Sequence, residues 1–514
     1  MPPPSVEARG SRTGSQATLT PAPAPRTDAT PVRSAPSLGE ALAPVVLMVS
    51  LLGCSVYLFG EDSSYGPNQI ALMIAAGLAG LIGLRHGYRW DELEAGIVAS
   101  ISVALPAALI LLTVGALIGT WILAGTVPQL IVLGATLLTP EWFYPATCLI
   151  CALVSISIGS SWTTAGTLGV ALMGSAQAME MSPAMTAGAV ISGAFFGDKM
   201  SPLSDTTNLA AAVSRVNLFS HIRNMLWTAA PAMIVSLLVF SFAGRAEGSA
   251  DLGMFETLRA ELEREFDLSP ITLAPLGLLL YLSLRRYPPL PVIGLGALFG
   301  GVVALSVQYE AAVALGPEGV DGWAGAAAGV WIALFDGYAT SSTLPQMADL
   351  LDRGGMSSML NTVWLILCAM VFGGVMERTG LLERLVADLL RLARGTTSLQ
   401  LTTLGTGFTT NILAADQYMA VAIPGRLYER AYRDRGLNTL NMSRTLEDGG
   451  TLTSVMIPWN TCGAYMAATL GVATFTYLPW LVFNIASVGF SILWAFTGTG
   501  LVAPERTDAE EVPA

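Results

Sequence analysis

Two polar segments interrupt the apolar runs of this chain, and both contain side chains that could bind a cation. The first runs from Gly197 to Asn208 and reads GDKMSPLSDTTN. The second runs from Glu447 to Thr461 and reads EDGGTLTSVMIPWNT. Ionisable side chains at bilayer depth are costly, so they persist mainly where they have a function. Because Pro and Gly break helices while Ser, Thr and Asn supply oxygen ligands, both segments predict an ion site made by interrupted helices.

The candidate ligands fall into four polar breaks, at 160–164, 198–208, 409–416 and 447–461. The carboxylates expected to couple ion and proton movement are Asp205, Asp198 and Asp416, and Asp205 ranks first because oxygen ligands rather than a lysine flank it. Hydroxyls, amides and backbone carbonyls with one or two carboxylates suit Na⁺, and a carboxylate can hold either Na⁺ or a proton. The side chains expected to bind the ion or shape its site are Ser160, Ser161, Thr163, Thr164, Thr206, Thr207, Asn208, Asn411, Glu447, Asp448, Asn460 and Thr461.

Each carboxylate also has a purely structural interpretation. Asp198 could pair with the adjacent lysine, which is the only lysine of the chain. Asp205 and Asp416 each precede a predicted helix and could serve as N-caps. The pair Glu447–Asp448 follows Arg444 and could form a structural salt bridge with it.

The composition is that of a polytopic membrane protein. Of 514 residues, 53% are hydrophobic and only 12% are charged, and the mean hydropathy is +0.59. A soluble chain carries roughly twice that share of charge. The net charge of −12 argues against a nucleic-acid partner, so the expected partners are the lipid bilayer and the transported ions. No cofactor and no enzymatic activity are expected.

Apolar runs long enough to span a bilayer recur along the chain, judged against about 20 residues per crossing. They predict an all-α protein with 11–13 transmembrane helices, some of them broken or re-entrant. The two halves align: 159–169 matches 415–425, and Ser201–Asp205 matches Ile457–Thr461 at the same offset. Such repeats are usually inverted and place the site where the halves meet.

The expected organisation has five parts. They are a disordered cytoplasmic tail at 1–38, a first repeat at 39–250, an amphipathic connecting segment at 251–268, a second repeat at 269–500 and an acidic tail at 501–514. Arginine clusters precede the first span and follow the second. By the positive-inside rule they place the N-terminus in the cytoplasm.

The same residues carry a resemblance to a known family. ISGAFFGDKMSPLSDTTNL at 191–209, GSSWTTAGT at 159–167 and IPWNTCGA at 457–464 are similar to the NhaC-type sodium/proton antiporters of the ion-transporter superfamily. The resemblance covers roughly residues 40–500. It implies Na⁺/H⁺ exchange by alternating access, two inverted repeats with re-entrant hairpins, and a location in the bacterial inner membrane.

Two other functions are considered. Some members of that family resemble Na⁺-coupled exchangers of malate and lactate, so a small carboxylate is an alternative cargo, and Li⁺ an alternative ion. An arginine near the midplane would favour the carboxylate. An intramembrane protease is a remote alternative, since no second Asp in a Tyr-Asp context is evident and both histidines lie at span boundaries. The sequence leaves the oligomeric state open, a homodimer being one option.

Overall fold

The computed structural model describes residues 34–247, 252–342 and 344–503. In this part of the chain there are helices and no strands, which confirms the expected all-α class. Most of the expected N-terminal tail and residues 504–514 of the expected acidic tail lie outside the described residues. The first helix begins within the expected tail, because Ser37 and Glu40 form a reciprocal capping box.

Short and long helices follow one another along the chain. The helices of the first half are α1 (Leu38–Phe59), α2 (Pro67–Arg85), α3 (Trp90–Leu123), α4 (Thr126–Leu137), α5 (Pro140–Ile158), α6 (Ser161–Thr164), α7 (Val170–Ala178), α8 (Pro183–Met200), α9 (Asp205–Val213) and α10 (Leu218–Glu247). Those of the second half are α11 (Leu252–Glu265), α12 (Ala274–Leu284), α13 (Pro289–Val307), α14 (Tyr309–Leu315), α15 (Gly322–Phe335), α16 (Pro345–Leu351), α17 (Gly355–Ser358), α18 (Leu360–Arg378), α19 (Leu381–Arg391), α20 (Thr396–Ala414), α21 (Gln417–Asp434), α22 (Thr439–Leu446), α23 (Leu452–Ser454), α24 (Thr461–Leu470), α25 (Thr474–Tyr477) and α26 (Val482–Thr497). Short 3₁₀ turns cover Gly60–Ser64, Pro270–Leu273 and Leu478–Trp480, and π-helical turns cover Ala165–Gly169 and Glu447–Thr451.

Seven of the described helices are long and apolar enough to cross a membrane, and nine spans result if each bent pair counts as one. The chain is therefore a multi-pass membrane protein. The bent pairs are Glu256–Glu265 with Pro270–Leu284, at 92°, and Thr474–Trp480 with Val482–Thr497, at 60°. The number is below the predicted 11–13, because helices such as the threonine-rich α20 and the charged α21 are long enough but too polar.

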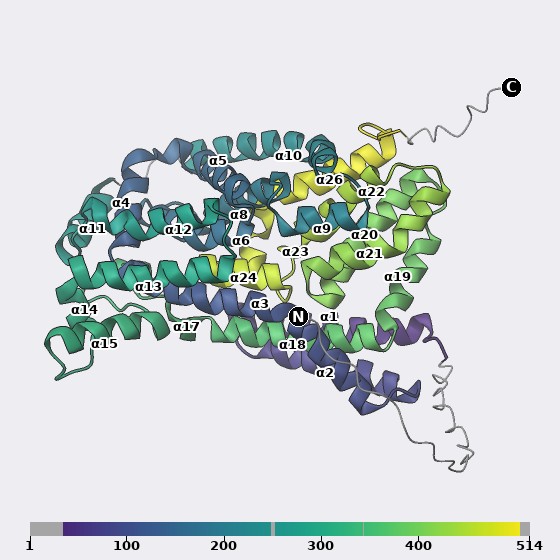
Figure 1. The fold of residues 1–514 in the computed structure, drawn as a ribbon, viewed down its shortest axis with the longest axis horizontal. Coiled ribbons are helices and arrows are strands. Elements are labelled where there is room, and N and C mark those ends of the chain that lie inside the picture. Colours follow the sequence, from purple (N-terminus) through teal and green to yellow (C-terminus); the bar gives the residue numbers. More distant parts are fainter. Residues whose placement is uncertain (1–33, 248–251, 343, 504–514) are drawn as a thin grey trace, which may run out of the picture. The chain divides into compact units, whose positions relative to one another are not determined.

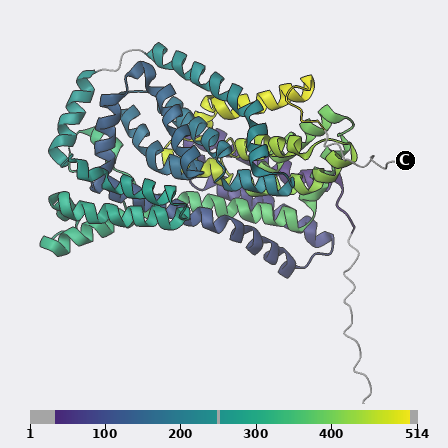
Figure 2. The same ribbon diagram turned by 45° about the horizontal axis from the view of Figure 1, so that its top comes forward.

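The broken helices lie between two groups of long helices. On one side α10 packs against α5 and α26, and on the other α3 packs against α13 and α18 (Figure 1). Between them, α8 contacts α10 and α26, while α24 contacts α3 and α18. The turned view keeps α18 alongside the blue and purple helices α2 and α3 (Figure 2). Most side chains of the polar breaks are thus buried between other helices, as interrupted helices require.

Two glycines explain the close packing of α8 on α5. A Cβ at Gly193 would lie 2.0 Å from the carbonyl oxygen of Cys148, and one at Gly197 would lie 2.4 Å from that of Ala152. Their spacing of four residues places both on one face of α8. Such small residues let two membrane helices approach closely by backbone contact. This contact brings the end of α8 beside the end of α5.

The helix starts repeat along the chain. Four N-cap residues of the first half recur at one constant spacing in the second half. These pairs are Thr139 and Gly395, Ser160 and Asp416, Ser182 and Asn438, and Ser204 and Asn460. Residues 159 and 415, which precede the second pair, both have a left-handed conformation, with φ of 77° and 55°. The sequence alignment of the halves therefore has a counterpart in helix boundaries.

Candidate functional site

The break between α5 and α6 holds a carboxylate from α8. Ser160 caps α6 by accepting a hydrogen bond from the Thr163 N–H at 3.1 Å, and the Thr164 hydroxyl donates to the Ser160 carbonyl at 2.9 Å. Ser161 donates twice to Asp198 Oδ2, from its N–H at 3.1 Å and from its hydroxyl at 2.7 Å. Asp198 is only 8% exposed. The structure thus brings the first two predicted breaks together around one buried carboxylate.

The break after α8 is closed by Ser204, not by Asp205. The Ser204 hydroxyl accepts from the Thr207 N–H at 3.3 Å and lies 3.2 Å from the Thr206 hydroxyl, so the N-cap alternative for Asp205 is wrong. Asp205 is an exposed residue in the first turn of α9 and lies within electrostatic range of the buried carboxylate of Asp198, on α8. Thr207 donates to the last carbonyls of α8, and the exposed Asn208 donates to carbonyls of the turn. The turn also packs on the first break, since a Cβ at Gly159 would lie 3.0 Å from the Ser204 nitrogen.

The third break centres on Asp416, which caps α21. Asp416 Oδ1 accepts from the N–H groups of Tyr418 and Met419 at 2.9 and 3.0 Å, as its structural interpretation predicts. The N–H of Thr461 donates to the carbonyl of Ala415 at 2.9 Å. Breaks three and four are therefore joined directly, as breaks one and two are.

Two asparagines complete the junction of breaks three and four. Asn411, on α20, donates to the carbonyl of Gly450 and to the hydroxyl of Thr453, the latter at 3.0 Å. Asn460 donates to Asn411 Oδ1 at 3.0 Å and accepts from the Cys462 N–H, also at 3.0 Å. The side chains of Asn411, Asp416, Asn460 and Thr461 at this junction are all buried, and the two asparagines are satisfied by neutral groups.

The two pairs of breaks meet through an aromatic contact. The rings of Trp162, in α6, and Tyr465, in α24, stack with centroids 4.2 Å apart. The Tyr465 hydroxyl also donates to the Trp162 carbonyl at 2.9 Å. Tyr418 lies within electrostatic range of Asp198, Asp205 and Asp416. The predicted coupling carboxylates are thus gathered in one region from distant parts of the sequence.

The strongest charge contact of this region is a buried ion pair between Lys199 and Asp448. Both side chains are fully buried. Lys199 Nζ donates to Asp448 Oδ1 and to the hydroxyls of Thr228 and Ser487, both at 3.2 Å. The alternatives that paired Asp198 with Lys199, and Asp448 with the arginine at 444, are therefore wrong. Adjacent helix residues point in different directions, so Lys199 faces away from Asp198.

Lys199, Thr228 and Ser487 are absent from the predicted site residues. One signal could have identified the lysine, which is the only one in the chain and occurs in a helix that is otherwise apolar for most of its length. Thr228 and Ser487 gave no such signal, because each is a single hydroxyl in a long apolar helix.

Several buried polar atoms beside this pair have no hydrogen-bond partner among the described residues. They are Asp448 Oδ2, Asn484 Oδ1 and His221 Nε2. The buried carboxylate of Glu447 has only the neutral hydroxyl of Thr451 near it and no ion-pair partner in this part of the chain. Within the described residues, no group of three or more His, Cys, Asp or Glu side chains has the arrangement of a metal site. Unpaired polar groups in a protein interior call for an explanation, such as a bound ion, a bound water or a functional role.

One face of α10 leads from the surface to this pair. His221 Nδ1 lies 2.8 Å from the Ser443 hydroxyl, and Asn224 Oδ1 accepts from Arg444 at 3.3 Å. One turn further on, Thr228 reaches the buried ion pair. The sequence places His221 at a span boundary, but the structure buries it fully.

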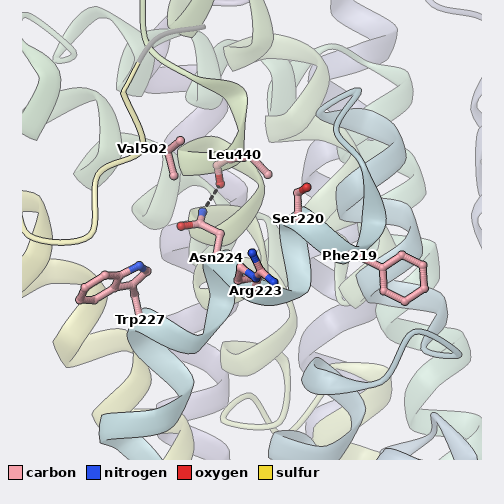
Figure 3. Close-up of a pocket in the computed structure, with 7 residues that line it drawn as sticks. All are labelled: Phe219, Ser220, Arg223, Asn224, Trp227, Leu440 and Val502. Carbon is pink, nitrogen blue, oxygen red and sulfur yellow. Dashed lines mark hydrogen bonds between the residues drawn. The ribbon is translucent and has the colours of Figure 1, made fainter.

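A pocket of about 470 Å³ lies at the outer end of this face, between α10 and α22. It is lined by Phe219, Ser220, Arg223, Asn224, Trp227, Leu440 and Val502 (Figure 3). Figure 3 shows Asn224 donating to the Leu440 carbonyl, at 2.7 Å, below the C-terminal segment that carries Val502. None of the predicted site residues lines this pocket.

Comparison with known proteins gives a consistent result. The model of the Na⁺/H⁺ antiporter family matches residues 193–499. The Na(+)/H(+) antiporter NhaC of Alkalihalophilus pseudofirmus is 36% identical over 466 residues, which cover 90% of this chain and 96% of that protein. A malate-2H(+)/Na(+)-lactate antiporter of Bacillus subtilis is 36% identical over an alignment that covers 84% of this chain and 90% of that protein. An arginine/ornithine antiporter, ArcD, of Halobacterium salinarum is 34% identical, with 93% and 96% covered.

Proposed function

We propose that this chain, which belongs to the Na⁺/H⁺ antiporter family, exchanges Na⁺ for H⁺ across the bacterial cytoplasmic membrane. The relatives are antiporters, which confirms the expectation of a transporter rather than an enzyme. The N-terminus would lie in the cytoplasm, as the arginine distribution predicts.

The observation that carries this proposal is the environment of Asp198. Its carboxylate is buried where two helices are interrupted, and its hydrogen bonds come from the neutral Ser161. Hydroxyls of Ser160, Thr163 and Thr206 lie in the adjoining breaks. Neutral oxygens with one carboxylate form a ligand set that suits Na⁺, and the same carboxylate can hold a proton instead. Asp205, at the exposed start of α9, would serve as the entrance to this site.

Alternating access would then follow from the two halves of the chain. We propose that the repeated helix starts reflect two inverted repeats, near 39–250 and 269–500, with the exchange site at their junction. The contact between Trp162 and Tyr465 crosses that junction. Motion of one half against the other would change which side of the membrane reaches the site.

A Na⁺-driven pH response tests the proposal. Everted vesicles containing the protein would be acidified, and a pH-sensitive dye would report proton release on addition of Na⁺, Li⁺ or K⁺. Na⁺ is expected to dequench the dye in the wild type and in Asp91→Asn, an exposed control, but not in Asp198→Asn. Asp205→Asn should need more Na⁺ for the half-maximal response. A wild-type protein that gives no dye response to Na⁺ would refute the proposed Na⁺/H⁺ exchange. A fully active Asp198→Asn variant would show that Asp198 is not part of the exchange site.

Arg444 supports a second candidate, exchange of a small carboxylate. It is only 2% exposed, its guanidinium binds the neutral oxygens of Asn224 and Gly500, and its Nε has no partner among the described residues. A buried guanidinium is well suited to a carboxylate. In the same vesicles, a response to malate with Na⁺ but not to Na⁺ alone would favour this cargo.

A further inference from the structure

The ammonium of Lys199 occupies a complete site of its own. Its three hydrogen bonds reach Asp448, Thr228 and Ser487, which belong to the π-helical turn, α10 and α26. The two hydroxyl oxygens also lie 3.2 and 2.9 Å from Asp448 Oδ1. A carboxylate and two hydroxyls around a buried positive charge are the kind of oxygen ligands that also bind Na⁺.

A second carboxylate beside this site has no ion-pair partner among the described residues. Glu447 is fully buried, the Thr451 hydroxyl of the same turn is the neutral group near it, and it lies within electrostatic range of Lys199. Asp448 Oδ2 is unpartnered in this part of the chain. The described interior therefore contains two adjacent carboxylates and one cationic side chain, which forms its ion pair with Asp448 and not with Glu447.

Building on the proposed Na⁺/H⁺ exchange, we propose that Lys199 is a tethered cation that competes with transported Na⁺ for Asp448. When Na⁺ binds Asp448 and the hydroxyls of Thr228 and Ser487, the ammonium is displaced towards Glu447. When Na⁺ leaves, the ammonium returns and keeps Asp448 from remaining unpaired. Asn224, which lines the pocket, lies about one turn from Thr228 of this second cation site on the same face of α10.

The opposing interpretation is a purely structural role, here called a pin, in which the hydrogen bonds of Lys199 only hold α8 against α10 and α26. The two interpretations differ in what Na⁺ does. A competitor lowers the affinity for Na⁺, so its removal must strengthen Na⁺ binding, whereas removal of a pin leaves binding unchanged or weakens it.

Equilibrium binding of radioactive Na⁺ to the purified full chain separates them. Lys199→Met, of similar length but uncharged, is expected to bind Na⁺ at least tenfold more tightly and to exchange more slowly, since nothing replaces the ion. Lys199→Arg, which keeps the charge, is the matched control and should stay within a few-fold of the wild type. Equal or weaker Na⁺ binding by a folded Lys199→Met would overturn the proposal.

A measurement on the wild type covers the case in which Lys199→Met does not fold. Because Lys199 is the only lysine, reductive methylation with formaldehyde reports on this side chain and on the chain's α-amine alone. Replacing choline chloride by NaCl should raise the methylation rate of Lys199 several-fold and leave the α-amine unchanged. An unchanged rate in protein that exchanges Na⁺ in vesicles would overturn this inference alone. If NaCl leaves the methylation rate of Lys199 unchanged and the protein also shows no Na⁺/H⁺ exchange in vesicles, the proposed function is overturned as well.

Discussion

Removing the charge of Lys199 should destabilise the protein far more than the loss of one ordinary side-chain contact would. In Lys199→Met, Asp448 stays fully buried with only the hydroxyls of Thr228 and Ser487 as donors. Breaking a buried ion pair by removing one partner costs about 3–5 kcal/mol, because the remaining charge is uncompensated. Replacing both partners by apolar residues is often close to neutral. Lys199→Met/Asp448→Leu should therefore recover most of the loss.

Unfolding in mixed micelles, followed by tryptophan fluorescence, would measure these differences. The exposed pair Arg430–Asp434 provides the control, and Arg430→Met should leave the unfolding midpoint unchanged within error. A single variant as stable as the wild type would refute the reasoning. So would a double variant less stable than Lys199→Met, because the cost would then come from packing rather than from an unpaired charge.

Two other substitutions test the close packing and the caps. Gly193→Ala should cost about 1–3 kcal/mol in the same assay, because its Cβ would overlap the Cys148 carbonyl, while Gly405→Ala, with open space around it, should cost nothing. A stable Gly193→Ala would show that α5 and α8 can separate. Asp416→Ala should lose about 1 kcal/mol of N-cap stability, whereas Asp416→Asn keeps the cap. An inactive but stable Asp416→Asn in the vesicle assay would assign Asp416 to the exchange, and full activity would restrict it to capping.

The fold class and the positions of the breaks could be predicted because they depend on local chemistry. An N-cap acts within a few residues of itself, so Asp416 could be predicted as the cap of α21. The cap of α9 was misplaced by one residue, because Ser204 and not Asp205 accepts from the first turn. The number of spans was harder to predict, because the helices that form the site contain threonines and charged residues where an ordinary transmembrane helix has apolar residues.

The partners of the buried charges could not be predicted in the same way. Asp198 and Lys199 are neighbours in sequence, yet the first binds Ser161 on α6 and the second binds Asp448, far along the chain. Successive residues of a helix point about 100° apart, so their partners depend on which helices pack on each face. That choice rests on the contact of α8 with α5, through Gly193, and with α10 and α26.

A helical membrane protein of the antiporter family with four polar breaks can be inferred without any coordinates. Composition, short-range capping and a long shared motif suffice for that, since each acts or is recognised locally. The packed fold was needed to learn that Asp198 is buried while Asp205 is exposed. It also showed that Lys199 neutralises Asp448 and leaves Glu447 without an ion-pair partner among the described residues. The energy of a charge depends on its burial and on its nearest opposite charge, and both follow from the packing of helices distant in sequence.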